Sequence, residues 1–448
     1  MRQPQYLYSL SQCVTILFYI LQAICEKHKQ RYKISFHDQQ YVSYFRITII
    51  IILSRTTCYT ASNNKKDIFM KVLIAPDSFK ECLDAFSVTT ALSIGLQRSG
   101  IADSAIVCRP LADGGEGLLE VLLHALGGEI RTLSVTGPMG EPVDARYGLL
   151  DTGKTAVIEM AQAAGLQLVP ESNRNPAVAT TRGVGELIRH TLDLEVQRII
   201  VGVGGSATND GGAGMATALG TTFLNATGNE LPAGGAALRQ LDHIDIERLD
   251  KRLQTTEIMV ACDVSNTLCG LQGASHVYGP QKGATPEMVQ ALDEALSHYA
   301  TVIGKALGGD ILALTGGGAA GGLAAGLAVF CGATLRSGVE LIFDAYGDMD
   351  RKIAEADSII TGEGVVDGQS AQGKVISGLA KRAKAANTPL ITVAGKVGDN
   401  LEALYDAGVT AVFPIAPMPM PVDVAIKQAK QHLEQTGESL GRIISTLL

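Results

Sequence analysis

The amino-terminal 69 residues of this 448-residue chain contain no glycine, although glycine occurs 50 times in the whole sequence. The same segment carries nine Lys/Arg against three Asp/Glu, whereas residues 70–448 carry 28 against 42. A change of composition this sharp indicates that the two parts have separate origins. We interpret residues 1–69 as an extension made of translated upstream sequence, with Met70 as the natural start. A targeting segment is the alternative.

Long apolar runs are also missing. The two runs of the extension, residues 14–25 and 47–53, are shorter than the ~20 residues that span a bilayer. The first run has the length of a signal-peptide core, but the Cys-Glu-Lys-His that follows from Cys25 is a poor cleavage site. These observations predict no membrane-spanning helix.

Residues 70–448 lack paired cysteines, metal-ligand spacings and basic clusters. The five cysteines are scattered without a C-x-x-C pair, and the six histidines show no metal-ligand spacing. This argues against disulfides and zinc, and favours reduced thiols in a cytoplasmic protein. The acidic excess argues against nucleic acid or an anionic membrane as the main partner, because both bind clustered Lys/Arg. We expect a small-molecule substrate and no catalytic histidine.

Predicted strands and helices alternate from Met70 onward, which is typical of largely parallel sheets covered by helices. The first strand is predicted at residues 71–75 and ends at Pro76, which has no N–H to donate to a ladder. A helix at 87–98 follows, with Ser87 as its N-cap. Further strands are predicted at residues 105–109, 147–150, 156–160, 198–203, 257–261, 358–361, 390–394 and 411–415. Further helices are predicted at residues 184–192, 286–307, 375–386 and 400–407.

The alternation is most regular at the two ends of this part of the chain, as though one open sheet were interrupted by a long insertion. We therefore predict an α/β fold with two α/β domains. The first is predicted to combine residues 70–135 with residues 340–448, and the second to consist of residues 136–339.

Glycine-rich turns after strands allow backbone N–H groups to approach an anion. The turn beginning at Gly202 fits G-x-G-x-x-A, but no Asp or Glu for a ribose contact lies between Gly211 and Asn229. The turn beginning at Gly316 fits G-x-G-x-x-G, a match expected by chance in a chain so rich in glycine. Both turns are weak dinucleotide signals and remain candidates for phosphate or carboxylate cradles.

A third turn, residues 368–375, nearly spells a P-loop. Val375 stands where the Mg²⁺-binding Ser/Thr belongs, and the preceding strand is predicted to end early, at Thr361. We reject a Walker A motif here and keep Lys374 as a candidate phosphate contact.

Carboxylates stand among these glycines or at strand ends rather than on polar helix faces. The candidates are Asp77, Asp113, Glu116, Asp210, Asp263, Glu363 and Asp367. Any single one could be a helix cap or a turn former. As a set beside anion-cradling loops they suit Mg²⁺-dependent phosphoryl transfer, in which some carboxylates hold the metal and one accepts the proton of the attacking hydroxyl. Lys80, Lys282 and Lys374 could offset phosphate charge, the alternative being solvated surface lysines.

Seven motifs in order carry a family resemblance. They are DSFKECLDA at 77–85, LADGGEG at 111–117, GVGGSATNDGG at 202–212, ACDVSN at 261–266, GPQKGAT at 279–285, GGGAAGGL at 316–323 and TGEGVVDGQSAQGK at 361–374. On these motifs the chain resembles the bacterial glycerate kinase family from Met70 to its carboxyl end, about 85% of its length. The extension takes no part in the resemblance.

The resemblance implies ATP-dependent phosphorylation of D-glycerate, with 2-phosphoglycerate favoured over 3-phosphoglycerate as the product. It implies a flavodoxin-like parallel-sheet domain built from both ends of the catalytic chain, with the second α/β domain inserted in its middle. The site would lie between the two, and a homodimer is left open. Leu118 stands where the family often has Thr, and Thr267 where it often has Pro. Neither departure changes an acid or a lysine.

Roles for individual residues follow as expectations, with ATP and Mg²⁺ as cofactors. We expect catalytic roles for Asp263, Asp210, Lys80 and Asp113, and metal ligation by Asp113 and Asp367. Contacts to substrate or nucleotide are expected from Asp77, Ser78, Gly114, Gly115, Glu116, Gly204, Gly205, Ser206, Lys282, Gly316, Gly317, Gly318, Gly362, Glu363, Gly364 and Lys374. The sequence leaves open which acid is the general base.

Two other functions fit parts of the sequence. An NAD(P)-dependent oxidoreductase is suggested by the two G-x-G matches, although the ribose-binding acid is missing. A non-enzymatic, two-lobed solute-binding protein would use residues 14–25 as its export signal.

Overall fold

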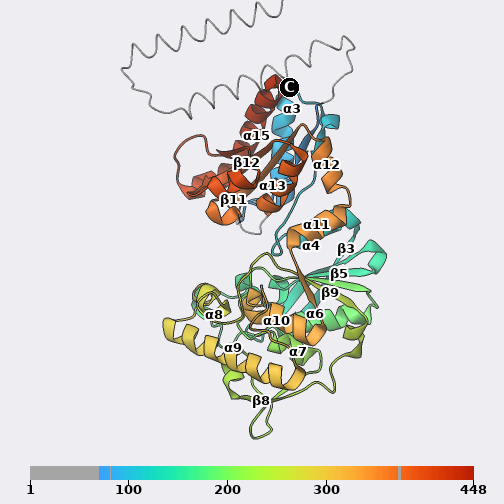
Figure 1. Ribbon diagram of the computed structural model, residues 1–448, viewed down its shortest axis with the longest axis vertical. Coiled ribbons are helices and arrows are strands. Elements are labelled where there is room, and N and C mark those ends of the chain that lie inside the picture. Colours follow the sequence, from blue (N-terminus) through green and yellow to red (C-terminus); the bar gives the residue numbers. More distant parts are fainter. Residues whose placement is uncertain (1–69, 81, 372–374, 448) are drawn as a thin grey trace, which may run out of the picture. The chain divides into compact units, whose positions relative to one another are not determined.

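The structure is a computed structural model, and it describes residues 70–80, 82–371 and 375–447 (Figure 1). The predictions made for residues 1–69 and for Lys374 lie outside this part of the chain. Within it, no helix is both long and apolar enough to cross a membrane.

The first sheet contains five parallel strands in the order β13-β12-β11-β1-β2. Its strands are β1 (Val72–Ile74), β2 (Ile106–Cys108), β11 (Ser358–Val366), β12 (Leu390–Val397) and β13 (Ala411–Pro414). The central strand β1 pairs with β2 on one side and with β11 on the other, where Val72 lies opposite Ser358. One parallel sheet is therefore built from both ends of residues 70–447, which confirms the predicted fold class.

The side chains of β1 alternate between two apolar layers, as expected for a strand buried on both faces. Val72 and Ile74 pack with α3 (Ala85–Arg98) and α15 (Val422–Leu447), which lie together in Figure 1. Leu73 packs with the helices of the other layer. These are α4 (Leu118–Leu126), α11 (Gly338–Tyr346), α12 (Met349–Glu355), α13 (Val375–Ala386) and α14 (Glu402–Ala407).

Two glycines bring α3 and α15 into close contact. A Cβ atom on Gly95 would lie 2.2 Å from the carbonyl oxygen of Glu434, and one on Gly437 would lie 2.7 Å from the carbonyl oxygen of Leu92. Distances this short do not occur for real Cβ atoms, so the two helices can pack at this distance only because both positions lack a side chain.

The second sheet has six strands in the order β10-β9-β6-β5-β4-β3. Its strands are β3 (Gly128–Thr136), β4 (Pro142–Leu150), β5 (Thr155–Glu159), β6 (Arg198–Gly202), β9 (Glu257–Ala261) and β10 (Thr334–Arg336). Strands β5, β6, β9 and β10 are parallel, whereas β3 and β4 add an antiparallel hairpin at one edge. A separate antiparallel pair joins β7 (Thr222–Asn225) to β8 (Leu241–Asp245).

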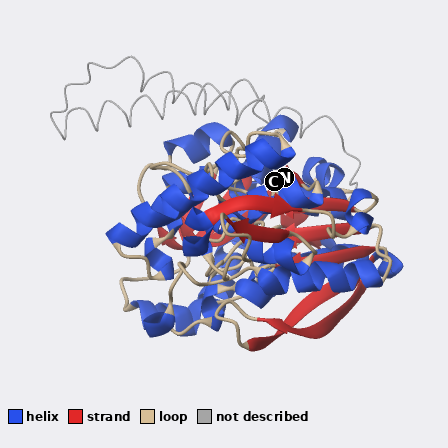
Figure 2. Cartoon of the chain, turned by 90° about the horizontal axis from the view of Figure 1, so that it is seen from below, coloured by secondary structure: helices blue, strands red, loops and turns tan. Residues whose placement is uncertain are grey.

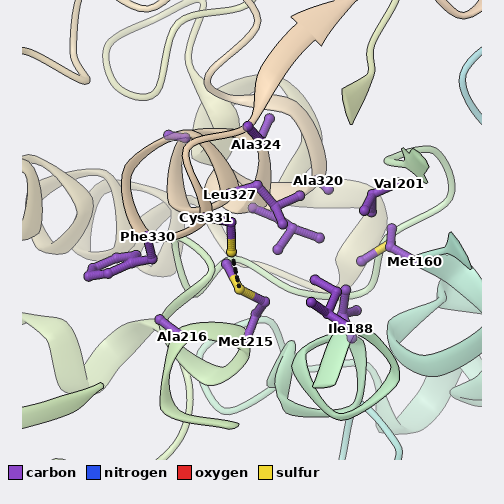
Figure 3. Packing of buried hydrophobic residues seen from close by; sticks show 14 of the residues in the cluster. Met160, Ile188, Val201, Met215, Ala216, Ala320, Ala324, Leu327, Phe330 and Cys331 are labelled. Carbon is purple, nitrogen blue, oxygen red and sulfur yellow. Dashed lines mark hydrogen bonds between the residues drawn. The ribbon is translucent and has the colours of Figure 1, made fainter. Parts of the chain in front are cut away.

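Figure 2 shows strands in red lying between helices in blue, and six helices belong to the part of the chain that forms the second sheet. They are α5 (Ala161–Ala164), α6 (Arg182–Asp193), α7 (Ala213–Ala218), α8 (Ala274–Tyr278), α9 (Pro286–Leu307) and α10 (Leu323–Cys331). Their core includes Ile188, Val201 and Leu327, all fully buried (Figure 3). The thiol of Cys331 lies 3.7 Å from the sulfur of Met215 within this core and behaves as a small apolar group.

One apolar cluster includes residues of both sheets. It contains Leu73 of β1, Leu119 of α4, Ile342 of α11, Val157 of β5 and Met259 of β9. Because α4 and α11 contribute to it, the turns that lead into these helices lie near the carboxyl ends of strands from both sheets. The domain boundaries at 135 and 339 stay predictions.

Several element predictions are confirmed, and two are wrong. The helix at 286–307 coincides with α9, and the helix at 375–386 with α13. Ser87 is not the N-cap of α3; the cap is Asp84, whose carboxylate accepts the Ser87 N–H at 2.8 Å. β11 does not end at Thr361 but continues to Val366, because it pairs with β12 along this whole length. The edge strand β3 was not predicted at all.

Candidate active site

A cavity of about 600 Å³, here called the glycine-loop cavity, lies at the carboxyl ends of strands of the second sheet. Open α/β sheets bind ligands at this edge. The lining residues that follow strands are Lys80, Asp113, Gly114, Gly115 and Glu116 from the first sheet and Glu159, Val203, Gly204, Gly205, Ser206, Cys262 and Asp263 from the second. Six of these are residues predicted from the sequence to contact substrate or nucleotide, and three are the predicted catalytic residues Lys80, Asp113 and Asp263.

The two glycine loops touch each other in this cavity. A Cβ atom on Gly204 would lie 2.4 Å from the Cα of Gly115, so the loops can approach this closely only without a side chain there. Gly205 has a φ of +71°, in the left-handed region that glycine adopts without strain. The Gly114 and Gly115 N–H groups already donate to Asp263 and Asp113, so the loop around Gly204 and Gly205 is the one whose bare backbone can approach an anion.

Asp263 holds the first glycine loop to the carboxyl end of β9. Its Oδ2 accepts the Gly114 N–H at 2.9 Å, and its Oδ1 accepts the Ser337 hydroxyl at 2.6 Å. The Gly338 N–H, at the start of α11, donates to both oxygens at 3.1 Å. Burial raises the pKa of Asp263, while these hydrogen bonds oppose the rise. The carboxylate therefore connects three segments and also faces the cavity.

Asp210 does not line the glycine-loop cavity. It is fully buried, and it accepts the N–H groups of Thr181, Gly212 and Gly214 at 2.9, 3.1 and 3.2 Å, together with the Thr181 hydroxyl. Burial raises its pKa and these hydrogen bonds act against the rise. Its contacts are those of a residue that positions the loop between β6 and α7.

Lys282 is buried in the wall of the glycine-loop cavity, with 1% of its surface exposed. Its ammonium donates to the Ser206 hydroxyl and to the Thr208 carbonyl oxygen, each at 2.7 Å. Burial lowers the pKa of Lys282 to about 7, although Asp210 acts to raise it. An anion bound here would restore the full charge on this ammonium.

Lys80 and Asp113 stand where two pockets meet. The Lys80 ammonium lies 3.3 Å from Oδ2 of Asp113, and Oδ1 of Asp113 accepts the Gly115 N–H at 2.8 Å. Both residues line the glycine-loop cavity and also a pocket of about 610 Å³, here called the strand-end pocket. The Asp113 carboxylate raises the pKa of Lys80. A ligand that occupied both pockets would therefore lie beside this ion pair.

Four further predicted contacts line the strand-end pocket, namely Asp77, Ser78, Glu363 and Gly364. Asp77 accepts the Ser78 N–H at 2.6 Å. Burial, and next the negative charge of Asp113, hold the pKa of Asp77 well above its ordinary value, and Glu363 adds to the rise. Three carboxylates therefore crowd the carboxyl ends of β1, β2 and β11.

Glu159, at the end of β5, is a residue that sequence reasoning missed. It lines the glycine-loop cavity, is 5% exposed, and accepts the Leu119 N–H at 3.2 Å. Burial raises its pKa to about 7, and Glu120 contributes. The only sequence signal was its place as the sole acid at the end of an apolar strand, TAVIE.

The remaining predicted residues lie apart from these walls. Gly316 and Gly318 pack against the loop after β9, where a Cβ on Gly318 would lie 2.2 Å from the Thr267 carbonyl oxygen, and Gly317 lies between them. Gly362 accepts the Asp77 N–H through its carbonyl oxygen at 2.9 Å. Asp367 belongs to the turn after β11, where its N–H donates to Ser370 at 3.3 Å. The structure does not bring Asp367 into the lining of either pocket.

The donor set suits a magnesium ion held mainly by its nucleotide. Within the described ranges, no group of three or more His, Cys, Asp and Glu side chains has the geometry of a self-contained metal site. Mg²⁺ in kinases typically takes one or two carboxylates and completes its shell with phosphate oxygens and water. The carboxylates of Asp77 and Asp113 repel each other, and a divalent cation between them would relieve that repulsion.

The similarity of this chain to known proteins covers nearly all of the residues that follow the extension. The model of the glycerate kinase family matches residues 72–445. A glycerate kinase of Bacillus subtilis is 45% identical over 375 residues, which cover 84% of this chain and 98% of that protein. A glycerate 2-kinase of Escherichia coli is 46% identical over 376 residues, with coverage of 84% and 98%. A crystal structure of a provisionally named glycerate kinase 2 from Salmonella typhimurium LT2 is similar with a TM-score of 0.73 and 47% identity, covering 84% of this chain and 98% of its own.

Proposed function

The chain belongs to the glycerate kinase family and is a phosphotransferase of the kind that uses ATP, and from this premise we propose that it phosphorylates D-glycerate. Membership in the family also sets aside the oxidoreductase and the solute-binding protein. The observation that carries the proposal is the Lys80–Asp113 pair, which stands at the mouth of a cavity lined by two touching glycine loops.

In the proposed reaction the glycine loops and Lys282 bind anionic oxygens in the glycine-loop cavity. The backbone of the loop at Gly204 and Gly205 would donate N–H groups to these oxygens, and the Lys282 ammonium supplies positive charge beside Ser206. The carboxylate of D-glycerate and the terminal phosphate of ATP are the anions that must meet here. Lys80 offsets the phosphate charge at the cavity mouth.

We assign the proton transfer to Glu159. A hydroxyl oxygen of glycerate attacks the γ-phosphorus, the bond to the β-phosphate oxygen breaks, and ADP leaves with the electron pair of that bond. The hydroxyl proton must pass to a base, and a base with a pKa of about 7 is well matched to this role near neutral pH. Asp263 and Asp210 act in this scheme as positioning residues, through the loops that they hold.

Mg²⁺ would be held by Asp113 together with Asp77, in place of the Asp367 expected from the sequence. When bound, the ion would neutralise phosphate charge and orient the γ-phosphate. The product that we propose is 2-phosphoglycerate, which is supported by the name of the Escherichia coli relative. A cytoplasmic location is proposed because ATP is available there and because the cysteines of the described residues are free thiols.

The test is to incubate the full chain with Mg²⁺–ATP and D-glycerate and to follow the products by phosphorus NMR. We expect ADP to form only when both substrates are present, together with the resonance of 2-phosphoglycerate. A 3-phosphoglycerate resonance would overturn the product assignment alone. No ADP above the level of a control without glycerate would overturn the proposed substrate.

A further inference from the structure

The strand-end pocket lies where the order of the first sheet reverses. From β1 the chain passes through α3 to β2 on one side, whereas from β11 it passes through α13 to β12 on the other side. The helices α3 and α13 belong to opposite apolar layers. Adjacent strands whose connections leave in opposite directions create a crevice at their carboxyl ends, where open α/β sheets bind their ligands. The strand-end pocket is lined by the turns after β1 and β13, by the last residues of β11 and β12, and by the first half of α15.

The walls of this pocket are mainly apolar. Five residues of α15 line it at the spacing of one helix face, Val422, Ala425, Ile426, Ala429 and His432. Val422 and Ile426 keep 74% and 41% of their surface exposed, and Met418 in the preceding turn keeps 65%. Exposed apolar side chains gathered around one concave surface indicate a binding site, because each loses its contact with water only when a ligand covers it.

His432 supplies an independent polar signal. It is 4% exposed and lines the strand-end pocket, yet its Nδ1 has no hydrogen-bond partner among the described residues. Buried polar atoms are nearly always paired, so an unpaired one in a pocket wall indicates a partner supplied by a ligand. A purine ring offers both donors and acceptors at its edge, and its faces suit apolar walls.

The charges fix the direction in which such a ligand would lie. Lys80 and Asp113 line both the strand-end pocket and the glycine-loop cavity. The glycine-loop cavity holds the bare loops and Lys282, which suit phosphate, whereas the strand-end pocket holds Met, Val and Ile side chains, which suit an aromatic base. D-glycerate has no apolar surface that could use the strand-end pocket. A nucleoside triphosphate has both chemistries at its two ends.

We propose that the strand-end pocket binds the purine base and ribose of ATP, with His432 at the edge of the base and the phosphates directed past Lys80 into the glycine-loop cavity. This assignment rests on the proposed kinase function for the identity of the nucleotide. It names a base site that differs in composition and in position from the glycine loops.

Photoaffinity labelling of the full chain with 8-azido-ATP, followed by mass mapping of the labelled peptides, tests the assignment directly. We expect labelling that excess ATP suppresses, within residues 415–432 or 363–365. Labelling confined to the loops at residues 203–206 or 319–320 would overturn the proposal, and so would the absence of ATP-suppressible labelling.

A matched pair of variants on α15 tests the same site in solution. Ile426→Trp places an indole in the pocket, whereas Ile443→Trp places one at a similarly exposed position outside it, since Ile443 is 45% exposed and lines neither pocket. We expect Ile426→Trp to weaken ATP binding, measured by calorimetry, at least tenfold, while the KM for D-glycerate changes less than twofold. Ile443→Trp should match the wild type. Equal ATP affinity in all three proteins would overturn the base site.

These outcomes separate the two proposals. If the wild type binds ATP in the strand-end pocket but makes no phosphoglycerate, the proposed substrate is wrong and the base site stands. If the wild type phosphorylates glycerate while Ile426→Trp keeps its ATP affinity, the base site is wrong and the proposed function stands.

Discussion

The carboxylates of the two sheets differ in how many hydrogen bonds the backbone gives them. In the second sheet, Asp210 accepts three N–H groups and a hydroxyl, and Asp263 accepts two N–H groups and a hydroxyl. In the first sheet, Asp77 accepts the N–H of Ser78, and Asp113 accepts that of Gly115. Asp77 and Asp113 instead face each other and Lys80.

This difference separates carboxylates that hold the fold from carboxylates available to a ligand. A carboxylate saturated with N–H donors contributes to the stability of the loop around it. Carboxylates that are crowded together and accept only one such donor each repel one another, and they are found where a cation or a ligand is expected to bind. Sequence alone does not distinguish the two kinds, because both occur as Asp beside glycine.

The largest effect is expected for Lys80→Met, which removes the cation at the junction of the two pockets. We expect kcat/KM for the phosphorylation of glycerate to fall roughly 10²–10³-fold, because the phosphate charge is no longer offset. Steady-state assays of ADP formation measure this fall. The unfolding free energy should change by less than about 1 kcal/mol, since 67% of the Lys80 side chain is exposed.

Lys71→Met is the matched control for this prediction. Lys71 forms a similar exposed ion pair on the same sheet, with Glu355 at 3.2 Å, but it lines neither pocket. It should keep full activity. If Lys80→Met were as active as Lys71→Met, the ion pair at the junction would have no part in the reaction.

The next effect contrasts Asp210 with Asp77. Asp210→Asn places an amide N–H₂ among N–H donors, so we expect it to lower the unfolding free energy by about 3 kcal/mol. Asp77→Asn removes a charge that burial and Asp113 already disfavour, and it should leave the stability unchanged or increased while activity falls. Urea denaturation of both variants measures the difference. A loss of stability in Asp77→Asn equal to that in Asp210→Asn would remove the distinction between the two kinds of carboxylate.

Apart from the loss of activity that removing the proposed base would cause, a smaller, pH-dependent effect on stability is expected for Glu159→Gln. Burial raises the pKa of Glu159 to about 7, from 4.5, so the folded state binds more protons than the unfolded state between these values. The stability that this group contributes is therefore full below pH 4.5 and is lost as the pH rises towards 7. We expect the unfolding free energy of Glu159→Gln, relative to that of the wild type, to rise by on the order of 1–3 kcal/mol between pH 5 and pH 7.

Urea denaturation at half-unit steps of pH measures this effect. Lys282 acts in the opposite direction above pH 7, because its lowered pKa makes the folded state bind fewer protons than the unfolded state up to about pH 10. The comparison should therefore be confined to pH 5–7. Parallel stability curves for Glu159→Gln and wild type in that range would show that Glu159 titrates normally in the folded protein.

Most buried elements of this fold were predictable from sequence. Strands such as β1 and β6 are mainly apolar runs. The start of α9 is marked by Thr285 as its N-cap and by Pro286 as its first residue, both of which are favoured at these positions. The edge strand β3 was not predicted because its first five residues are exposed. Neither an apolar/polar alternation nor an apolar run therefore marks it. The predicted end of β11 was too early because Gly362 and Gly364 have low strand propensity. In the structure, pairing with β12 overrides that propensity.

The candidate site was predictable in its glycine loops and less so in its acids. The motifs located Gly114, Gly204 and Asp113, since bare backbone next to acids is a local pattern. The roles of Asp210 and Asp263 depend on donors that lie 29 to 149 residues away, such as Thr181 and Gly114. Glu159 is prominent only through burial, which depends on the packing of α4 against β5. Such long-range facts leave no local signature.

The pairing of β1 with β11 also sets an order of events during synthesis. The central ladder of the first sheet can form only after Ser358, 286 residues beyond its partner Val72, has been made. The apolar layer that contains Val72 is completed only by α15, at the end of the described residues. The second sheet uses strands from Gly128 to Arg336 and can pair while the ribosome is still making the rest. Until then β1 and β2 expose apolar faces that their own neighbours cannot cover. We therefore expect the newly made chain to pass through a long interval in which its first strands are open to aggregation unless chaperones or transient contacts cover them.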